Sequence, residues 1–598
     1  MAGNDDNRTA NQWKDFSKLG VKKGTFTRTA RKLETASIKH AHRFITRRWS
    51  NVRNVSRHMV GWLVLMALLV GLTWLQTSWF QDGYLTQGPQ SGGVYAEGMV
   101  GRVETLNPLY VSSVSERTVD KLVFSSLLAY DRDNALRSDV AKSWSVGEDG
   151  KTYTIDLRDD VFWHDGQKLT VDDVVFTIKL MQSPTVKSQL YKNWAGVSVE
   201  KTSDKQLRIT TPAVYAPFAH ALTFSILPKH LLEKIELSKL REDSFSRIPV
   251  GSGPFKFQRI QVINPATDRL VVHMENNPQY HGGIVRLNRF QVHTFQSSAL
   301  LKKGLLTGEV GAAYRLDSED ARAIREANSF IKNTHIKINN GVFAIFNTAN
   351  PNLSDATVRQ AVTEATNRKS IIQNAVHGNA GPLEGPVLSQ SVQSQLAFDA
   401  HSAAAKLDQA GWVTGADGIR QKDGNKLELI VVAPNSGDYP AILAQLTKQW
   451  KQVGIGVSPK LVMRDKLYSE FVQPRAYDVF LNELSIGADP DVYPYWHSSQ
   501  AKADGLNFAN YQSPVVDDIL SSARTRLDAS LRTSKYQAFA DQWAKDAPAV
   551  ALYQPEANYL TMPSVWTGED SSVLADSSVR LRYVYEWTAQ TAQVYRTP

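Results

Sequence analysis

Four side chains near the start of the globular region have types that could do chemistry. His164 and Asp165 stand one turn ahead of Asp172 and Asp173 in the stretch FWHDGQKLTVDDVVFTIKLM, residues 162–181. A catalytic pair needs carboxylates that converge on one point, and a metal needs its His and acidic ligands on one face of an element. Here the histidine and the aspartates lie on opposite sides of a turn and a helix start. The pattern therefore favours a structural role.

The elements that hold these residues can be read from the surrounding pattern. YTIDLRDDVFW, just before them, alternates apolar and polar residues as a strand with one buried face does. Asp165-Gly166 is a turn signal, and Thr170 with Asp173 three residues later resembles a capping box at a helix start. The helix that follows places one apolar face at positions i, i+3, i+4 and i+7: Val171, Val174, Val175 and Ile178.

Other catalytic signals are missing from the sequence. GSG at residues 251–253 lacks the spacing of a nucleophile elbow, and no Walker A or HExxH pattern occurs. The chain has no cysteine, which removes thiolate nucleophiles, disulfides, zinc-thiolate sites and the lipid-bearing cysteine of a lipoprotein. Its 13 histidines are scattered. We therefore expect no reaction centre, no metal site and no cofactor.

The positive charge of the chain is concentrated at its start. The net charge is +9, but residues 1–58 hold 14 Lys and Arg against 4 Asp and Glu, leaving 54 against 55 in the rest. MVGWLVLMALLVGLTWLQTSWF, residues 59–80, follows without a charge and is long enough to cross a bilayer core of about 30 Å. Positive flanks stay on the cytoplasmic side, so residues 1–58 are predicted inside and everything after Phe80 outside.

Two alternatives accompany this anchor. A cleaved secretory signal is one, although its apolar part is usually about 7 to 15 residues. The basic tail could also bind anionic lipid or RNA, but its simpler interpretation is a topology determinant, and we expect no nucleic-acid partner. QDGYLTQGPQSG, residues 81–92, is predicted to be a tether, and residues 93–598, too many for a single core, are the working part.

An ordered series of motifs resembles the extracellular solute-binding proteins of peptide and nickel ABC transporters. The long run from Val119 to Met181, which contains the opening stretch, is similar to the first of them. The others follow in the order of that family: LPKHLLE (227–233), PVGSGPFKF (249–257), NPQYHGG (277–283), VRQAVTEATNRKSII (358–372), AKLDQAGW (405–412) and DAPAVALYQP (546–555). Each motif is weak alone, but the ordered set covers almost everything after residue 93.

The resemblance implies an α/β fold with two lobes, a periplasmic-binding-protein-like (Venus flytrap) receptor with an extra subdomain, here preceded by one transmembrane helix. Lobe I would comprise residues 93–340, with the subdomain at about 126–246, and lobe II would comprise 341–545. Residues 546–598 would return to lobe I.

The resemblance also implies a ligand site around YDVFLNELSIGADPDVYPYWHSSQ, residues 477–500. In that family the strand before Asp489-Pro490 lends its backbone to an extended peptide, which adds like one more strand. Asn482, Glu483 and Leu484 occupy that place. Tyr493, Tyr495 and Trp496 could line side-chain pockets or pack in the core.

One position departs from the peptide-binding pattern. Peptide-binding members hold the ligand's amino terminus with an acidic residue, and the matching position here is Ile486. Glu483, Asp489 or Asp491 could replace that acid, or the ligand could lack a free amino group. Four further positions are carried over as ligand contacts, each with an ordinary alternative as a turn or core residue: Tyr110, Val111, Tyr191 and Asn347.

The sequence thus predicts a membrane-tethered extracytoplasmic receptor of an ABC importer that binds peptides or other small solutes and delivers them to the permease subunits. Two alternatives stay open. An anchored hydrolase of peptides or glycans needs two convergent carboxylates, which the sequence does not supply. A sensor with the same fold would act through the cytoplasmic tail. The receptor would work by closing its lobes on a ligand.

Overall fold

The computed structural model describes residues 35, 38–39, 49–388, 395–568 and 573–595. The chain forms two compact units. One comprises Met1–Gly88 with Gln593–Pro598, and the other comprises Pro89–Ala592. The second unit is called the body below.

The first unit is dominated by one long helix, α2 (Trp49–Tyr84). Its segment His58–Phe80 is long and apolar enough to cross a membrane. Large apolar side chains on it are exposed, Trp62 at 68% and Trp79 at 80%. The predicted tether, residues 81–92, has regular structure along most of its length. The helix continues through Tyr84, and β1 (Leu85–Gln90) pairs with β23 (Gln590–Tyr595).

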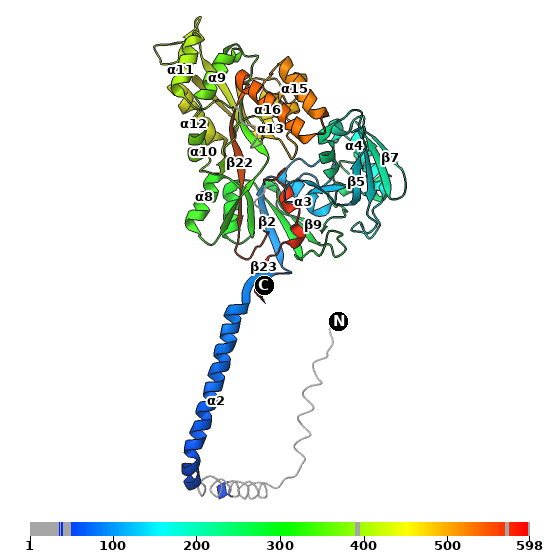
Figure 1. The fold of residues 1–598 in the computed structure, drawn as a ribbon, viewed down its shortest axis with the longest axis vertical. Helices are drawn as coiled ribbons and strands as arrows, with labels where there is room; N and C mark the ends of the chain where they lie inside the picture. The colour runs from blue at the N-terminus through cyan, green and yellow to red at the C-terminus, as the bar shows by residue number, and fades with distance from the viewer. Residues whose placement is uncertain (1–34, 36–37, 40–48, 389–394, 569–572, 596–598) are drawn as a thin grey trace, which may run out of the picture. The chain divides into compact units, whose positions relative to one another are not determined.

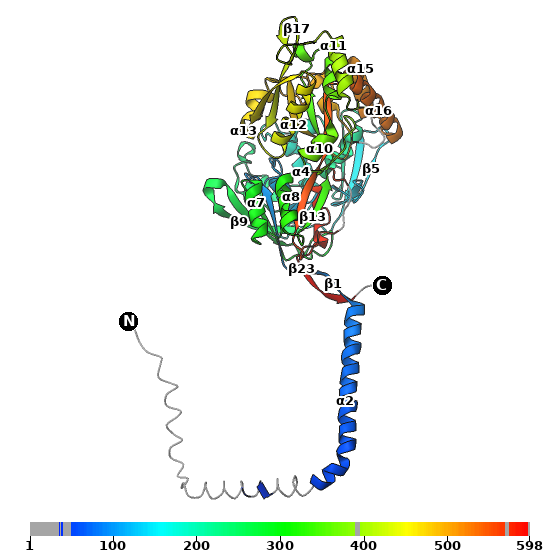
Figure 2. The ribbon, with the colours of Figure 1, turned by 90° about the vertical axis from the view of Figure 1, so that its left-hand side faces the viewer.

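The body is built on a sheet that has twelve strands in the described residues, in the order β20-β19-β21-β14-β22-β12-β2-β11-β10-β9, with β13 and β15 (Ala380–Gly381) also on β22. With the lobe boundaries that the resemblance predicts, the strands of lobe I are β2 (Val94–Val100), β9 (Phe255–Asn264), β10 (Arg269–Asn276), β11 (Arg289–Phe295), β12 (Ala312–Leu316) and β13 (Lys332–Lys337). Those of lobe II are β14 (Asn340–Phe346), β19 (Glu428–Pro434), β20 (Gly456–Val462) and β21 (Val479–Ser485). Figure 2 shows β9 at the outer edge of lobe I.

One strand, β22 (Ala549–Thr561), belongs to both lobes. Its first residues pair with β14 as far as Tyr553, and from Glu556 onward it pairs with β13. Figure 1 shows it running through both halves of the body. The chain therefore crosses between the lobes at the link from β13 to β14 and again within β22.

Helices cover both faces of the lobe II sheet because its strands are apolar on both faces. Along β14, Val342, Ala344 and Phe346 face one core, and Phe343 and Ile345 face another. The first core is covered by α9 (Ala356–Glu364), α10 (Arg368–Asn374), α11 (Ala400–Gln409) and α12 (Tyr439–Gln452), and the second by α14 (Tyr493–Trp496), α15 (Pro514–Thr525) and α16 (Ala529–Asp546). Lobe I carries α3 (Val114–Val123), α7 (Ser298–Leu306) and α8 (Ser318–Ala327).

The subdomain contains the stretch that opened the sequence analysis. Its elements are β3 (Leu128–Tyr130), β4 (Leu136–Ser138), β5 (Ala141–Val146), β6 (Thr152–Leu157), α4 (Val171–Gln182), α5 (Tyr191–Trp194), β7 (Ser198–Lys201), β8 (Gln206–Thr210) and a 3₁₀ segment, η3 (Ala216–Thr223). The sheet order is β5-β6-β8-β7. In Figure 1 these elements lie to one side of the body.

In the structure the four polar residues make local contacts, and the carboxylate of Asp165 lies 2.7 Å from Nε2 of His230. Asp173 accepts hydrogen bonds from the Thr170 amide at 2.8 Å and from the Lys229 amide at 2.8 Å. Asp172 pairs with Lys201 at 2.8 Å. His164 points the other way, toward the GSG turn, where its Nδ1 accepts from the Gly251 amide at 3.2 Å. Burial lowers the pKa of His164 to about 4, so the ring is neutral and serves packing.

The GSG turn itself is a close-packing device. A Cβ on Gly251 would lie 1.9 Å from the carbonyl oxygen of Val123, at the end of α3. Only glycine allows the backbone to approach this closely. Ser252 is buried and its carbonyl oxygen accepts from the Ser125 hydroxyl at 3.0 Å.

Candidate ligand site between the lobes

Three strands of lobe II end at the same edge. β19 pairs in parallel with both β20 and β21, so residues after Pro434, Val462 and Ser485 come together. In open α/β sheets, ligands bind outside the carboxyl ends of parallel strands. This edge is therefore the first place to look for a ligand site.

The strand β21 has an unpaired stretch at that edge. It pairs with β14 along its whole length, from Val479 to Ser485. On the other side, within the described part of the chain, it pairs with β19 only through Val479 and Phe480. Beyond Phe480 this edge has no strand partner among the described residues, and it presents the main-chain groups of Leu481 and Glu483, with the Ser485 carbonyl accepting from the Tyr495 hydroxyl. An extended ligand could pair with such an edge.

Glu483 joins the two lobes at this edge. An Nη2 of Arg315, on lobe I, lies 3.2 Å from its carboxylate, and Asn340 donates a second hydrogen bond. Burial raises the pKa of Glu483, but Arg315 and Asn340 together lower it below its usual range. Arg315 adopts a φ of 58°, a left-handed conformation that is unusual for a residue other than glycine. It sits at a pairing irregularity between β12 and β22.

The two aspartates after β21 are also paired with arginines. Arg532 of α16 binds Asp489 through both of its terminal nitrogens, at 2.7 and 2.6 Å. Arg524 of α15 binds Asp491, with Nε 2.9 Å from one oxygen. Arg524 also lies over the ring of Tyr493, 3.9 Å from its centroid. All three acids that could replace the missing ammonium clamp are therefore neutralised by guanidinium groups.

Two further hydrogen bonds reach lobe II from the rest of the body. The hydroxyl of Tyr215, in the subdomain, donates to Asp491 at 3.1 Å. Ser318 of lobe I donates to Asp438 of lobe II at 2.8 Å. Next to that bond, burial together with the neighbouring Asp438 and Asp320 raises the pKa of Asp317 to about 6. The lobes are thus in polar contact on both sides of β21.

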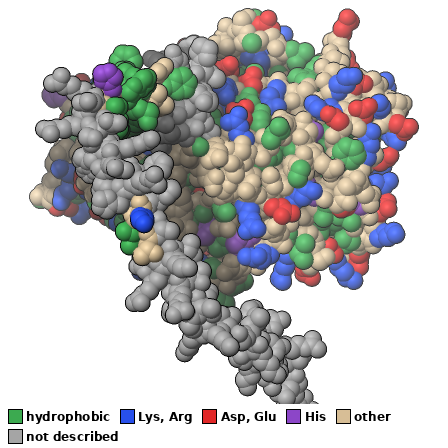
Figure 3. All heavy atoms as spheres, turned by 90° about the horizontal axis from the view of Figure 1, so that it is seen from below, with side chains coloured by type: hydrophobic (Ala, Val, Ile, Leu, Met, Phe, Trp, Pro, Cys, Tyr) green, Lys and Arg blue, Asp and Glu red, His purple; other side chains and the backbone are tan. Residues whose placement is uncertain are grey.

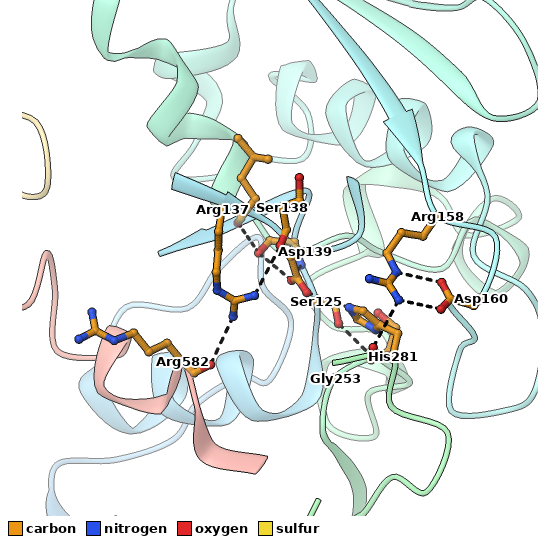
Figure 4. A network of polar contacts seen from close by, with 12 residues as sticks. Ser125, Arg137, Ser138, Asp139, Arg158, Asp160, Gly253, His281 and Arg582 are labelled. Carbon is orange, nitrogen blue, oxygen red and sulfur yellow. Dashed lines mark hydrogen bonds and ion pairs between the residues drawn. The ribbon is translucent and has the colours of Figure 1, made fainter. Parts of the chain in front are cut away.

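A cavity lies between the subdomain and the segment 576–585. It has ≈ 90 Å³ that the centre of a water molecule can reach. Its lining mixes aromatic and aliphatic walls with the charged side chains of Lys121, Arg137, Asp139, Asp576 and Arg582. Figure 4 shows Arg137 directed at the carbonyl oxygens of Ser138 and Arg582, with Asp139 close by.

One wall of the cavity reaches the lobe interface. The hydroxyl of Tyr130 lies 3.2 Å from Nδ1 of His220, and the two rings stack at 5.8 Å. Tyr130 packs on the cluster of Leu574, Ala575 and Val579, and so does Ala488 from the loop after β21. Movement of lobe II would therefore act on the cavity wall through Ala488.

The residues carried over from the family have mixed surroundings. Trp496 is 1% exposed and packs edge-on against Phe343 and Trp543, and Leu484 is buried in the same core. The core alternative therefore describes Trp496 in this structure. Asn347 acts as a structural link, since its side chain donates to the Tyr477 carbonyl at 3.1 Å.

The remaining carried-over positions do not gather with these. Tyr110 is buried under Arg241, whose guanidinium carbon lies 5.3 Å from the ring centroid. Val111 is half-buried, and Tyr191 is 36% exposed at the start of α5. Neither these contacts nor those of Asn482 and Tyr493 test ligand binding, so their role as ligand contacts stays a prediction.

Sequence reasoning missed the partners that complete the interface: Arg315, Asp438, Tyr215, Arg524, Arg532, Tyr130 and His220. No local motif marks them. The sequence does not tell which polar residues of α15 and α16 turn toward the strand ends.

Comparison with known proteins agrees with this architecture. Residues 135–505 match the profile of the bacterial extracellular solute-binding proteins, family 5 Middle. The chain belongs to that family. Its members are binding receptors, not enzymes, and this chain is therefore a solute-binding protein of the ABC transporter type with an extracytoplasmic binding domain.

Individual relatives span nearly the whole body. The oligopeptide-binding protein AppA of Bacillus subtilis is 27% identical over 490 residues, which covers 79% of this chain and 88% of AppA. The structure of AppA with a nonapeptide superposes with a TM-score of 0.70 at 26% identity, over 84% of this chain and 99% of that chain. NikZ of Campylobacter jejuni, in complex with Ni(L-His), gives a TM-score of 0.71 at 28% identity, over 83% and 99%. These likenesses establish the two-lobed fold.

Proposed function

We propose that this family 5 solute-binding protein binds peptides between its lobes and delivers them to the permease of an ABC importer, while α2 anchors it in the membrane. The observation that carries the proposal is the edge of β21 beyond Phe480, which has no strand partner among the described residues, since main-chain pairing there suits an extended peptide. The curated relative AppA, an oligopeptide-binding protein, supports the same ligand class. NikZ, solved with Ni(L-His), is the reason to test it.

Binding would shift an equilibrium between open and closed lobes. A ligand that pairs with β21 and also touches lobe I gains contacts only when the lobes are together, so it raises the closed population. The anchor would keep the receptor at a high effective concentration near the permease.

The test is to identify what the protein carries. The full chain is extracted in detergent, its bound compounds are released by mild denaturation, and they are identified by mass spectrometry. Peptides should be recovered, and re-adding one should raise the Tm by mass action. As a matched ligand, the same peptide with N-methylated backbone amides should bind at least about tenfold more weakly. Recovery of non-peptide solutes only, with no heat from peptides in calorimetry, would overturn the proposal.

A further inference from the structure

The end of the body at which the chain enters carries two exposed arginines. The amide of Gly92 donates to the carbonyl oxygen of Arg286 at 2.7 Å, and the amide of Arg289 donates to Gly93 at 3.3 Å. β2 then starts at Val94, in parallel register with Arg289. Both arginine side chains are exposed. They therefore flank Gly92 and Gly93, just before the chain enters the main sheet.

Apolar side chains from separate loops are exposed at the same end. Ile284, two residues before Arg286, is 87% exposed. Trp566 is 37% exposed, and its amide and carbonyl groups bond to Thr588 at 2.9 and 3.0 Å, just before the Gln590 side chain packs beside Gly93. Phe330 is 60% exposed and comes just before β13, which pairs with the end of β22.

The short covalent connection to the apolar segment of α2 limits how far this end of the body can lie from a membrane. Only residues 81–91 separate the apolar segment His58–Phe80 from Gly92, and twelve fully extended steps reach at most about 43 Å. If α2 spans the bilayer, this end of the body cannot leave the neighbourhood of the lipid surface. Trp and basic side chains are the types that the membrane–water interface favours, and each Arg or Lys near an anionic surface contributes about 1 kcal/mol.

The end of the body at which the chain enters carries both basic and acidic side chains. Figure 3, a view from below, shows basic, histidine and acidic side chains interspersed on the visible face. Glu275 is the cross-strand neighbour of Arg289, but its carboxylate is held by Gln258 at 2.6 Å. Glu586, also at this end, faces Arg132 at 3.6 Å. Arg286 and Arg289 are exposed basic side chains whose backbones bond to Gly92 and Gly93 at the entry point.

We propose that the body rests on the membrane through this end, with Ile284, Phe330 and Trp566 in the headgroup region and Arg286 and Arg289 on anionic lipid phosphates. This inference rests on the proposed membrane anchor. Its consequence is mechanical. Lobe I is held against the bilayer while lobe II, joined to it through the β13–β14 link and β22, is the part that moves when a ligand closes the lobes.

The absence of cysteine allows a clean labelling experiment on the full chain. Three single-cysteine variants carry an environment-sensitive fluorophore: Ile284→Cys at the proposed contact, Leu75→Cys in the apolar helix, and Val413→Cys as a control on lobe II with 67% exposure. Each is reconstituted in vesicles of phosphatidylethanolamine with about 30% phosphatidylglycerol, with and without a nitroxide on the lipid headgroup or acyl chain. We expect quenching at residue 284 at least twice that at residue 413, and acyl-chain quenching at residue 75.

Two outcomes overturn the inference and are distinguishable. Quenching at residue 75 with equal values at residues 284 and 413 leaves the anchor intact and rejects the contact. No quenching at residue 75 rejects the anchor and, with it, this inference. A charge arm adds Arg286→Gln with Arg289→Gln, and Arg322→Gln as the exposed control on α8. Only the double variant should lower quenching at residue 284, and only in vesicles with phosphatidylglycerol; a loss of the same size in zwitterionic phosphatidylcholine would reject the contact with anionic lipid.

Discussion

Acetylation of a bound peptide's amino terminus should change its affinity less than about threefold. A charge-assisted hydrogen bond to a ligand ammonium is worth about 1.5 to 3 kcal/mol, or roughly 10- to 150-fold. Ile486 has no group that can supply it, and the three nearby acids are occupied: Glu483 by Arg315, Asp489 by Arg532 and Asp491 by Arg524. A peptide held mainly by main-chain pairing with β21 would therefore not depend on its ammonium.

Removal of one guanidinium group should make the affinity for a peptide depend on its free amino terminus. Arg315→Asn takes away the charge beside Glu483, and asparagine tolerates the left-handed backbone at residue 315 better than most side chains do. Glu483 would keep its bond from Asn340 and would be free to accept from an ammonium. We expect the ratio of free to acetylated affinities to rise from below about threefold to at least about tenfold.

The assay is calorimetric titration of one co-purified peptide in both forms. The ratio of the two affinities is the readout, because any effect of Arg315→Asn on lobe closure applies to both peptides. Arg322→Asn, on α8 and 2.8 Å from Glu326, is the control and should leave the ratio unchanged. A ratio above about tenfold in the unmodified protein would refute the reasoning, since another acid would then act as the clamp. An unchanged ratio in Arg315→Asn would show that Glu483 does not face the ligand's end.

Three further outcomes follow from the same structure. Burial, Asp438 and Asp320 raise the pKa of Asp317 to about 6, so this carboxyl group ionises in the unfolded chain at a lower pH than in the folded chain, and folding stability falls between about pH 4 and pH 6. Asp317→Asn should therefore raise the Tm at pH 7 and not at pH 4. A gain of equal size at both pH values would contradict this. Glu97→Gln breaks the buried ion pair with Arg580, whose Nη2 lies 2.8 Å from the Glu97 carboxylate, and should lower the free energy of unfolding, measured in urea, by about 3 to 5 kcal/mol. Arg102→Gln, in the exposed ion pair with Glu104, is the control and should lower it by less than about 1 kcal/mol. N-terminal sequencing of membrane-extracted protein should begin before residue 58, and a start near Gln81 would indicate a cleaved signal instead.

Much of the fold could be predicted from local patterns. Period-two and helical spacing placed β6 and α4 correctly, and Thr170 with Asp173 marked the helix start because capping depends on residues only three positions apart. The ordered motifs gave the two-lobed architecture. The segment 81–92 shows the limit: its Gly, Gln and Pro content suggested no regular structure, yet Leu85–Gln90 pairs with the distant strand β23. Pairing partners at that separation leave no local trace.

The site could be predicted only in part, for the same physical reason. The position of β21 and the departure at Ile486 were visible, because both are set by the chain around Asp489-Pro490. The partners were not, because Arg315, Arg524 and Arg532 reach these acids from other elements. Their charge changes the interpretation of the site: Glu483, Asp489 and Asp491 would be three ammonium-binding candidates if seen alone.

These ion pairs also bear on how the lobes close. Arg532 and Arg524 bind Asp489 and Asp491 within lobe II, so those pairs persist whether or not the lobes meet. Arg315 and Glu483 belong to different lobes, so their attraction favours the closed form even without a ligand. The same holds for the bond from Ser318 to Asp438. A peptide that binds as proposed would need to contribute only the remaining free-energy difference between the open and closed forms, which main-chain pairing along β21 could supply without any ammonium clamp.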